Sequence, residues 1–364
     1  MGQPHCTVMV SQTVLIDKIV SQFSQRNASP TPMPMDPGLK LWCANYKKLT
    51  CDELKQITKL PYRSLVGCLL YLSIGTHPDT TYSVQQLSQY LDCYTYAHWN
   101  AALRVVFYLS GTCDYKLCLS SNSPISILGF TDSDWANCLD TRWSIGGHAY
   151  MLGSGVISWQ AHKQKTIAPS SCEAEYVAAF EASKEAIWLQ VLLSTISHQP
   201  KKPTTILCYN NTATNLSEDP LLHDHVKHIN IKHHFLREHV QTQEITLSYI
   251  NTHDNSADIF TKALNTKKFT CFRNFLGIKA SQTPCEEECS WWGGVLWLSR
   301  HCEHVSITIP LFLFLPSSFF MYDSPLYSTQ YIYTYSTYYA PQSIILWLRW
   351  ATLFTSHNII TDFT

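Results

Sequence analysis

The chain has 364 residues, a formal net charge of −1, and charged side chains at only 15% of its positions. This length suits two domains, or one domain with appendages. The near-zero net charge excludes a disordered charged chain and a strongly basic nucleic-acid-binding protein, so any contact with nucleic acid must come from a local basic surface. Residues 1–30 are polar and lack an apolar core, so we expect no signal peptide there. We therefore expect a cytoplasmic or nuclear protein whose 14 cysteines are reduced.

The first third of the chain predicts helices. Residues 1–60 are polar and proline-rich, and their apolar side chains predict one amphipathic helix around residues 14–23, followed by a linker. In residues 61–114, leucine and aromatic side chains recur with a helical period, most clearly at 82–91 and 98–109. We expect this second segment to be mainly helical.

Residues 115–278 change to a mixed α/β pattern. Two glycines separated by one serine predict a hairpin turn at 153–155. A long helix is expected from 170 to about 196, with one buried stripe made of Val177, Phe180, Ile187 and Val191. Two further helices are expected at 226–240 and from about residue 254. Five short apolar runs predict strands at 125–131, 148–152, 156–159, 205–208 and 245–250.

Residues 279–364 lack the pattern of a folded domain. From residue 304 onward the only formally charged side chains are Asp323, Arg349 and Asp362, among many tyrosines, serines and threonines. The apolar run at 305–322 is interrupted by two prolines, so we expect neither a membrane span nor a membrane partner. We expect a poorly structured, aggregation-prone aromatic tail, of the kind that translation beyond a native reading frame produces.

Several carboxylates occupy positions from which they could converge. Asp132 follows the apolar run of an expected strand, Glu173 and Glu175 lie in the first turns of the long helix, and Asp258 begins the last helix. Carboxylates held together need a neutralising cation, and a set of oxygen ligands suits Mg²⁺. Two such ions can activate a water molecule and stabilise the leaving oxygen of a phosphodiester. The alternative for each acid, taken singly, is a solvated side chain or a helix cap.

Four motifs in this order resemble the ribonuclease H domain of copia-type (Ty1/copia) retrotransposon Pol polyproteins. They are Thr-Asp-Ser-Asp-Trp-Ala at 131–136, Ser-Ser-Cys-Glu-Ala-Glu-Tyr at 170–176, Lys-His-Ile at 227–229 with His-Phe at 234–235, and Ala-Asp-Ile-Phe-Thr-Lys-Ala-Leu at 257–264. Upstream, Tyr-Arg-Ser-Leu-Val-Gly at 62–67 and Tyr-Leu-Ser-Gly-Thr at 108–112 resemble the segment that joins the reverse transcriptase to that domain. The resemblance covers about residues 11–278.

The resemblance implies an α/β, ribonuclease H-like fold, in which a mixed five-stranded sheet is flanked by helices. It implies that residues 1–60 are the end of a reverse transcriptase with a linker, 61–114 a helical connection, 115–278 the ribonuclease H-like domain, and 279–364 the tail. It also implies Mg²⁺-dependent hydrolysis of the RNA strand in RNA/DNA hybrids, with two ions per site. Asp132, Glu175 and Asp258 match the catalytic, metal-binding carboxylates, and Glu173 is the alternative to Glu175.

One catalytic position departs from the family pattern. Where the family has Cys-Asp-Asn, this chain has Cys208, Tyr209 and Asn210, so Tyr209 occupies the position of an Asp. A neutral phenol cannot replace a bridging carboxylate, and we expect weakened Mg²⁺ binding and a loss of roughly a thousandfold or more in rate. His77, Trp143 and Asn230 also depart from the pattern at positions where Arg, Arg and Asp are usual. These changes predict a decaying copy with weak or no activity.

The expected partners follow from the same resemblance. An RNA/DNA hybrid is the expected substrate, with the reverse transcriptase portion of Pol normally in cis and no small-molecule substrate. The chain lacks the Tyr-x-Asp-Asp motif of a polymerase. Two alternatives to an enzyme stay open: a catalytically dead hybrid-binding remnant, and a non-functional transposon fragment. The expected phosphate contacts, each of which could instead be a solvated surface residue, are Lys163, Lys165, Lys227, Arg237 and Lys262.

Overall fold

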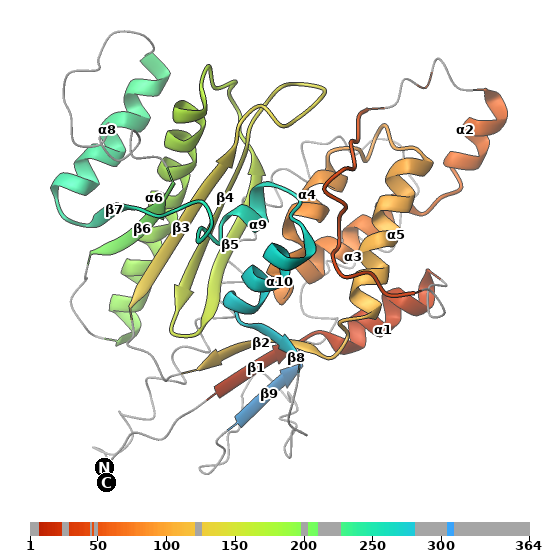
Figure 1. Ribbon diagram of the computed structural model, residues 1–364, viewed down its shortest axis with the longest axis horizontal. Coiled ribbons are helices and arrows are strands. Elements are labelled where there is room, and N and C mark those ends of the chain that lie inside the picture. The colour runs from red at the N-terminus through yellow and green to blue at the C-terminus, as the bar shows by residue number, and fades with distance from the viewer. Residues whose placement is uncertain are drawn as a thin grey trace. The chain divides into compact units, whose positions relative to one another are not determined.

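The computed structural model describes residues 7–23, 29–43, 46, 50–120, 126–197, 203–209, 227–280 and 304–308 (Figure 1). The chain forms two compact units. The first contains the described residues up to 120 and those from 263 onward, and the second contains the described residues from 126 to 262. The second unit holds the predicted carboxylates, and the first is built mainly of helices.

A mixed five-stranded sheet forms the centre of the second unit. In order across the sheet its strands are β5 (Gly155–Lys163), β4 (Ile145–Leu152), β3 (Ile127–Asp134), β6 (Thr204–Cys208) and β7 (Ile245–Tyr249). The pairs β3–β4 and β4–β5 are antiparallel, whereas β3–β6 and β6–β7 are parallel. The turn between β4 and β5 uses Gly153 with a positive φ of 64°, as the predicted hairpin requires. The predicted fold class, a ribonuclease H-like mixed sheet flanked by helices, is confirmed.

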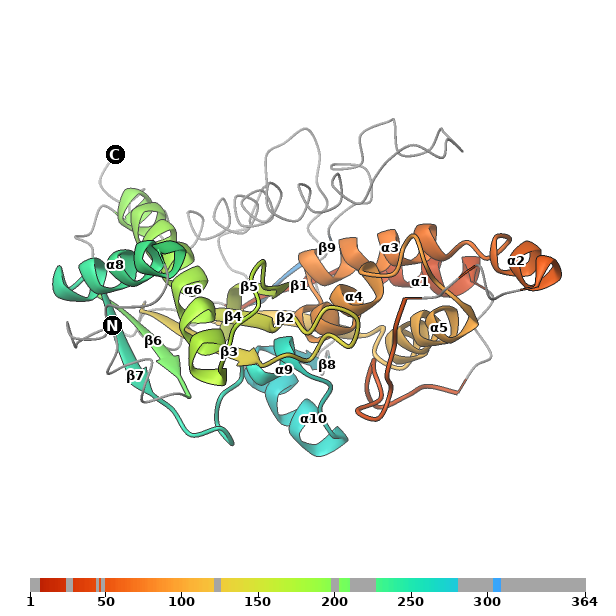
Figure 2. The same cartoon turned by 90° about the horizontal axis from the view of Figure 1, so that it is seen from above.

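Helix α6 (Ser171–Ser197) lies against this sheet, with α8 (Lys227–Gln241) beside it (Figure 2). The predicted stripe of large side chains is wrong, because Val191 is exposed and only Val177 of that set is buried. Most of the buried apolar positions of the helix are alanines, at 174, 178, 179, 182 and 186, together with the larger Tyr176, Val177 and Leu189. Small side chains let the helix approach closely, so that the Tyr150 hydroxyl of β4 donates a hydrogen bond to the main-chain carbonyl of Ala182.

The last predicted helix starts at residue 258 and is short, and a helix that was not predicted follows it. The short α9 (Asp258–Thr261) belongs to the second unit, and α10 (Thr266–Phe275) belongs to the first. After Lys262 the backbone is extended, and the new helix starts at Asn265, whose side chain accepts a hydrogen bond from the Lys268 N–H at 3.0 Å. An N-cap asparagine of this kind starts a helix independently of the one before it, and this separates the two.

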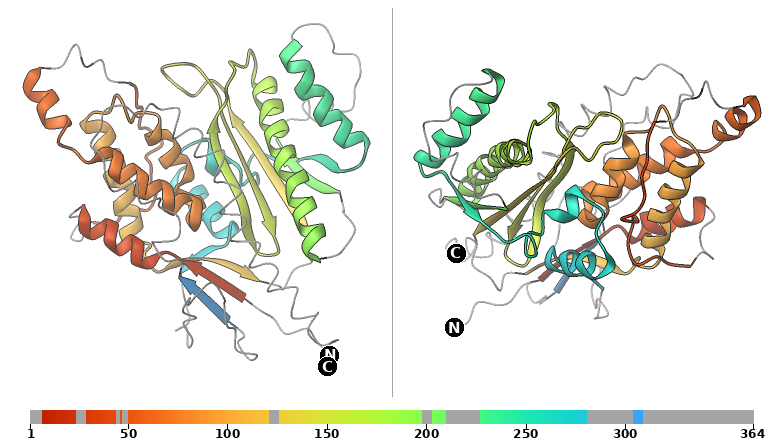
Figure 3. Two further views of the ribbon diagram at one scale, coloured as in Figure 1. Left: turned by 180° about the vertical axis from the view of Figure 1, so that it is seen from behind. Right: turned by 45° about the horizontal axis from the view of Figure 1, so that its top comes forward.

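The first unit combines helices with a small sheet (Figure 3). Its helices are α1 (Thr13–Gln22), α2 (Cys51–Ile57), α3 (Tyr62–Gly75), α4 (Thr81–Ser88), α5 (Tyr96–Ser110) and α10, so the helical prediction for residues 61–114 is confirmed. The sheet has the order β8 (Ile278–Ala280), β2 (Tyr115–Ser120), β1 (Thr7–Ser11) and β9 (His304–Thr308). Of the predicted tail, residues 279–280 and 304–308 are described and belong to this sheet, and the rest lies outside the described residues.

A buried polar network links α5 and α10 to the short turn before α4. The Tyr108 hydroxyl donates a hydrogen bond to Asp79, and Arg273 donates to the Tyr108 hydroxyl at 3.3 Å. His77 lies 3.4 Å from Asp79, and all four side chains are at most 7% exposed. The histidine that departs from the family pattern is therefore part of the core of the first unit.

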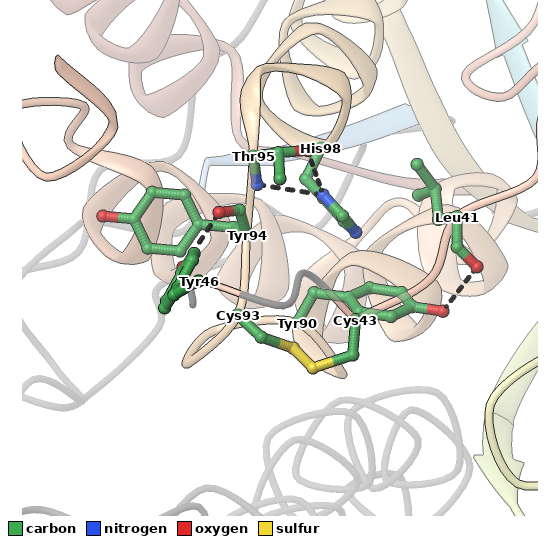
Figure 4. Close-up of a disulfide and its surroundings, with 8 residues drawn as sticks. All are labelled: Leu41, Cys43, Tyr46, Tyr90, Cys93, Tyr94, Thr95 and His98. Atoms are coloured by element: carbon green, nitrogen blue, oxygen red, sulfur yellow. Dashed lines mark hydrogen bonds between the residues drawn. A yellow bond between two sulfur atoms is a disulfide. The ribbon is translucent and has the colours of Figure 1, made fainter. Parts of the chain in front are cut away.

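The first unit also contains a disulfide between Cys43 and Cys93 (Figure 4), whose Cα atoms are 5.3 Å apart. Next to it the Tyr90 hydroxyl donates to the Leu41 carbonyl at 3.0 Å. The expectation that all cysteines are reduced is wrong for this pair. No other cysteine in the described part of the chain belongs to a disulfide. None of the helices in these ranges is long and apolar enough to cross a membrane.

Candidate functional site

Strand β3 supplies two carboxylates to one face of the five-stranded sheet. Asp132 and Asp134 are two residues apart, so both side chains point to the same face. Asp132 is only 3% exposed and accepts a hydrogen bond from the Thr261 hydroxyl. Its partner across the antiparallel pair is Gly147 of β4, which leaves space for the segment that carries Thr261.

The segment around α9 is held against the end of the sheet by its own polar side chains. Asn255 donates from its side chain to the Thr131 carbonyl at 3.0 Å and accepts from the Ala257 N–H at 3.2 Å. A Cβ atom on Gly147 would lie 2.6 Å from the Cβ of Phe260. This close approach brings Asp258, which is 0% exposed, to the end of the sheet that carries Asp132.

Helix α6 supplies the third predicted carboxylate. Glu175 is 6% exposed, and burial together with the neighbouring charge of Asp132 raises its pKa well above the usual range. Its Oε2 atom is buried and has no hydrogen-bond partner. The charge of Asp258 acts on it in the same direction. The structure thus brings Asp132, Glu175 and Asp258 together, whereas Glu173 is half-buried in the first helical turn, with its N–H donating to Ser170 at 3.2 Å.

A lysine ammonium lies between two of these carboxylates. Lys262 Nζ is 2.8 Å from Asp258 Oδ1 and 3.7 Å from Asp132 Oδ2. Burial raises the pKa of Asp132 to about 7, although the Lys262 charge opposes this effect. Burial alone would lower the pKa of Lys262, but the charges of Asp132 and Asp258 outweigh it and the net shift is upward. The cluster is therefore a set of buried acids with one internal cation.

These residues suit Mg²⁺ by their chemistry. All the candidate ligands are carboxylate oxygens, the type that Mg²⁺ prefers, and Glu175 Oε2 is a buried oxygen that a cation would satisfy. Within the described ranges, however, no three His, Cys, Asp or Glu side chains stand in an arrangement that could hold a metal ion. The type of donor atom fits the metal, but in this structure the carboxylates of Asp132 and Asp258 face the ammonium group of Lys262.

Tyr209 follows strand β6 at the position that lies next to Asp132 in the sheet register. The last pair between β3 and β6 joins Thr131 to Cys208, so the next residue on each chain is Asp132 on β3 and Tyr209 beyond β6. The Tyr209 side chain is 45% exposed, and its ring centroid is 6.4 Å from that of Tyr249. Asn210, the other candidate at this position, lies outside the described residues.

The predicted phosphate contacts have different surroundings. Lys165 is exposed, Lys163 places its ammonium 5.2 Å from the centroid of the Trp143 ring, and Arg237 is partly buried. The side chain of Lys227 lies outside the described part. Lys262 pairs with acids of the cluster. For all five, contact with phosphate stays a prediction.

Sequence reasoning missed Asp134 as a member of the cluster. Burial raises the pKa of Asp134, the charge of Lys262 lowers it, and the charge of Asp258 raises it further. The sequence does indicate this position, because the motif Thr-Asp-Ser-Asp places two acids two residues apart on an expected strand, where their side chains share one face.

Comparison with known proteins places the chain in a family. No protein-family model matches the chain. It is 35% identical over 276 residues to the retrovirus-related Pol polyprotein from transposon TNT 1-94 of Nicotiana tabacum, which covers 75% of this chain and 20% of that protein. It is 36% identical over 282 residues to the Pol polyprotein from transposon RE2 of Arabidopsis thaliana, covering 76% of this chain and 18% of that protein.

Among solved structures, LC11-RNase H1 in complex with an RNA/DNA hybrid aligns with 11% identity over 37% of this chain and 94% of that chain, with a TM-score of 0.29. The chain spans about a fifth of the Pol polyproteins that it matches. The sequence motifs, the topology of the five-stranded sheet and the likeness over three quarters of the chain agree. The chain belongs to the family of copia-type retrotransposon Pol polyproteins, within which it carries a ribonuclease H-like domain.

Proposed function

We propose that the second unit is a ribonuclease H that hydrolyses the RNA strand of RNA/DNA hybrids as part of a copia-type Pol, and that this copy is impaired. The observation that carries the proposal is the meeting of Asp132, Glu175 and Asp258, from three different elements, in one buried cluster. Buried acids at such density are a feature of active sites rather than of stable cores. The reverse transcriptase portion of Pol would normally act in cis.

In this proposal Asp132, Glu175 and Asp258 hold Mg²⁺, for which the oxygen-only donor set is suited. Bound Mg²⁺ supplies an activated water and stabilises the leaving oxygen of the phosphodiester. The chain's own residues fix the geometry. Thr261 orients the Asp132 carboxylate, and Asn255 holds the loop before α9 against β3. Lys165 and Lys163 supply positive charge for a sequence-independent contact with the hybrid backbone.

Tyr209 is the proposed cause of the impairment. The register supports this assignment, because Tyr209 follows the residue that pairs with Thr131, next to Asp132. A phenol with a normal pKa of about 10 adds no negative charge at neutral pH. Loss of one ligand that stabilises transition-state charge should cost roughly a thousandfold or more in rate. Mg²⁺ binding is weakened for the same reason.

The test is cleavage of a labelled RNA/DNA hybrid in Mg²⁺ by the full chain and by its Tyr209→Asp variant. Tyr249→Asp is the matched control, because Tyr249 is a similarly exposed tyrosine at the end of the neighbouring strand. We expect cleavage from Tyr209→Asp alone, and its loss when Asp132→Asn is added. Equal cleavage by the unchanged chain would refute the assignment of Tyr209.

The second candidate is a protein that binds the RNA/DNA hybrid without cleaving it. Tyr209 in place of an Asp favours this candidate, because the loss of one carboxylate would impair cleavage but leave the lysines available for contact with the hybrid backbone. Salt-dependent binding of the hybrid by both the unchanged chain and Tyr209→Asp, with cleavage by neither, would select it. A non-functional fragment would neither bind nor cleave. One set of binding and cleavage measurements therefore distinguishes an impaired ribonuclease H, a hybrid-binding remnant and a non-functional fragment.

A further inference from the structure

The position of Lys262 in the acidic cluster supports a role different from phosphate contact. Its ammonium faces two carboxylates that are almost completely buried, Asp258 at 0% and Asp132 at 3% exposure. Its own side chain is 36% exposed. The cationic end thus lies at the buried acids, although the side chain as a whole is partly exposed.

The geometry makes Lys262 a competitor of any cation that binds the same oxygens. An ammonium at 2.8 Å from Asp258 Oδ1 occupies the space in front of that oxygen, and Mg²⁺ needs the same oxygen at about 2.0–2.1 Å. Two cations facing one carboxylate oxygen also repel each other strongly in a buried site. The lysine must therefore leave when a metal ion takes these oxygens.

The local structure lets the lysine leave without unfolding the site. Lys262 is the residue that ends α9, and its N–H donates to the Asp258 carbonyl at 3.2 Å. The backbone is thus anchored, while the four-carbon side chain has rotatable bonds and reaches solvent. A lysine is a compact point charge on such a stem, so it can swing outward where a bidentate arginine would be held.

We propose that Lys262 is the resident counter-ion of the carboxylate cluster, and that a divalent cation enters the cluster only by displacing its ammonium group. In the metal-free protein Lys262 neutralises Asp132 and Asp258 and keeps α9 on the sheet. In the metal-bound protein the ammonium faces solvent. The inference rests on the proposed function in taking the cluster as the metal site, but it concerns binding and stability and not cleavage.

The experiment compares the full chain with Lys262→Met, using Mg²⁺ or Ca²⁺ alone as the probe and no nucleic acid. Calorimetry gives the dissociation constant and thermal unfolding gives the metal-free stability. Lys184→Met is the matched control, because Lys184 pairs with Glu181 on the exposed side of α6, away from the cluster acids that Lys262 faces. We expect Lys262→Met to bind the metal roughly tenfold tighter and to melt at a lower temperature without metal, while Lys184→Met changes neither.

If Lys262→Met does not fold, the double variant Lys262→Met with Asp258→Asn removes both charges of the pair. Asp258→Asn should destabilise the unchanged protein and stabilise the Lys262→Met background. Equal or weaker metal binding by folded Lys262→Met, no metal binding by either protein, or additive effects of the two substitutions would each overturn the inference. Tighter binding by Lys262→Met, together with no cleavage by Tyr209→Asp, would overturn the proposed function and leave this inference standing.

Discussion

Gly147 is the position where the smallest change should disturb the acidic cluster most. It pairs with Asp132 across β3 and β4, and the segment 258–261 crosses directly over it. A Cβ atom there would lie 2.6 Å from Phe260 Cβ, 3.1 Å from Thr261 Cγ2 and 3.4 Å from the Gln160 carbonyl. None of these is the free end of a long side chain, so Gly147→Ala must push α9 away from the sheet.

The cost follows from this geometry. A contact of 2.6 Å has to lengthen by about an ångström, which is overpacking of a closed site, and such changes cost about 1–3 kcal/mol. Moving α9 also separates Asp258 from Asp132 and breaks the hydrogen bond from Thr261. We therefore expect a loss in unfolding free energy at the upper end of that range, and weaker Mg²⁺ binding.

Gly146→Ala is the matched control, because Gly146 is the neighbouring residue on the other face of the same strand. There a Cβ atom would meet His162 Cε1 at 3.1 Å, at the end of a side chain that can rotate. We expect a cost below about 1 kcal/mol. Urea unfolding, with amide hydrogen exchange of β3 and β4 to locate the effect, measures both variants. A Gly147→Ala variant no less stable than Gly146→Ala would refute the reasoning.

Three further predictions concern stability. Burial lowers the pKa of His148 from 6.5 to about 3, so the folded protein keeps this side chain neutral while the unfolded chain takes up a proton below pH 6.5. The free energy of unfolding should therefore decrease by about 2 kcal/mol between pH 7 and pH 5 and continue to decrease toward pH 3. Urea unfolding of His148→Gln should lack this part of the pH dependence. Arg273→Met removes the buried cation beside Tyr108 and should cost about 3–5 kcal/mol; a thermal shift no larger than that of an exposed arginine would contradict it. The Cys43–Cys93 disulfide closes a loop of 50 residues and should contribute about 4 kcal/mol; reductant should lower the melting temperature of the unchanged chain, and a serine double variant should show no response.

Patterned segments were predictable from the sequence. The strands β3 to β7 and the helices α1, α5, α6 and α8 have apolar side chains at regular spacing or clear turn residues at their ends, and each lies within a few residues of its predicted range. The short strands β1 and β2 were missed although their sequences, TVMVS and YKLCLS, suit a strand. Each is only five or six residues long, so its pattern is hard to separate from the neighbouring polar or helical segments.

The buried face of α6 shows why hydrophobic periodicity can mislead. Large apolar side chains gave a plausible stripe, yet Val191 is exposed and most of the buried apolar positions of the helix are alanines. Periodicity ranks residues by their transfer free energy, whereas close helix–sheet packing selects small volume. The order and spacing of the motifs predicted that Asp132, Glu175 and Asp258 lie close together. They could not predict that Lys262 pairs with two of these carboxylates, because that pairing depends on where α9 meets the sheet.

The small sheet of the first unit has a consequence for dissecting the gene. Strand β2 precedes the second unit and β8 follows it, and the two strands pair with each other. The codons for residues 126–262 therefore form an internal cassette, bracketed by two segments that belong to one sheet. Exchanging this cassette in frame leaves β1, β2 and β8 intact, whereas cutting the gene at residue 115 separates β2 and β8 from β1, to which β2 is hydrogen-bonded. The connectivity therefore favours replacing residues 126–262 within the chain over truncating the chain before β2.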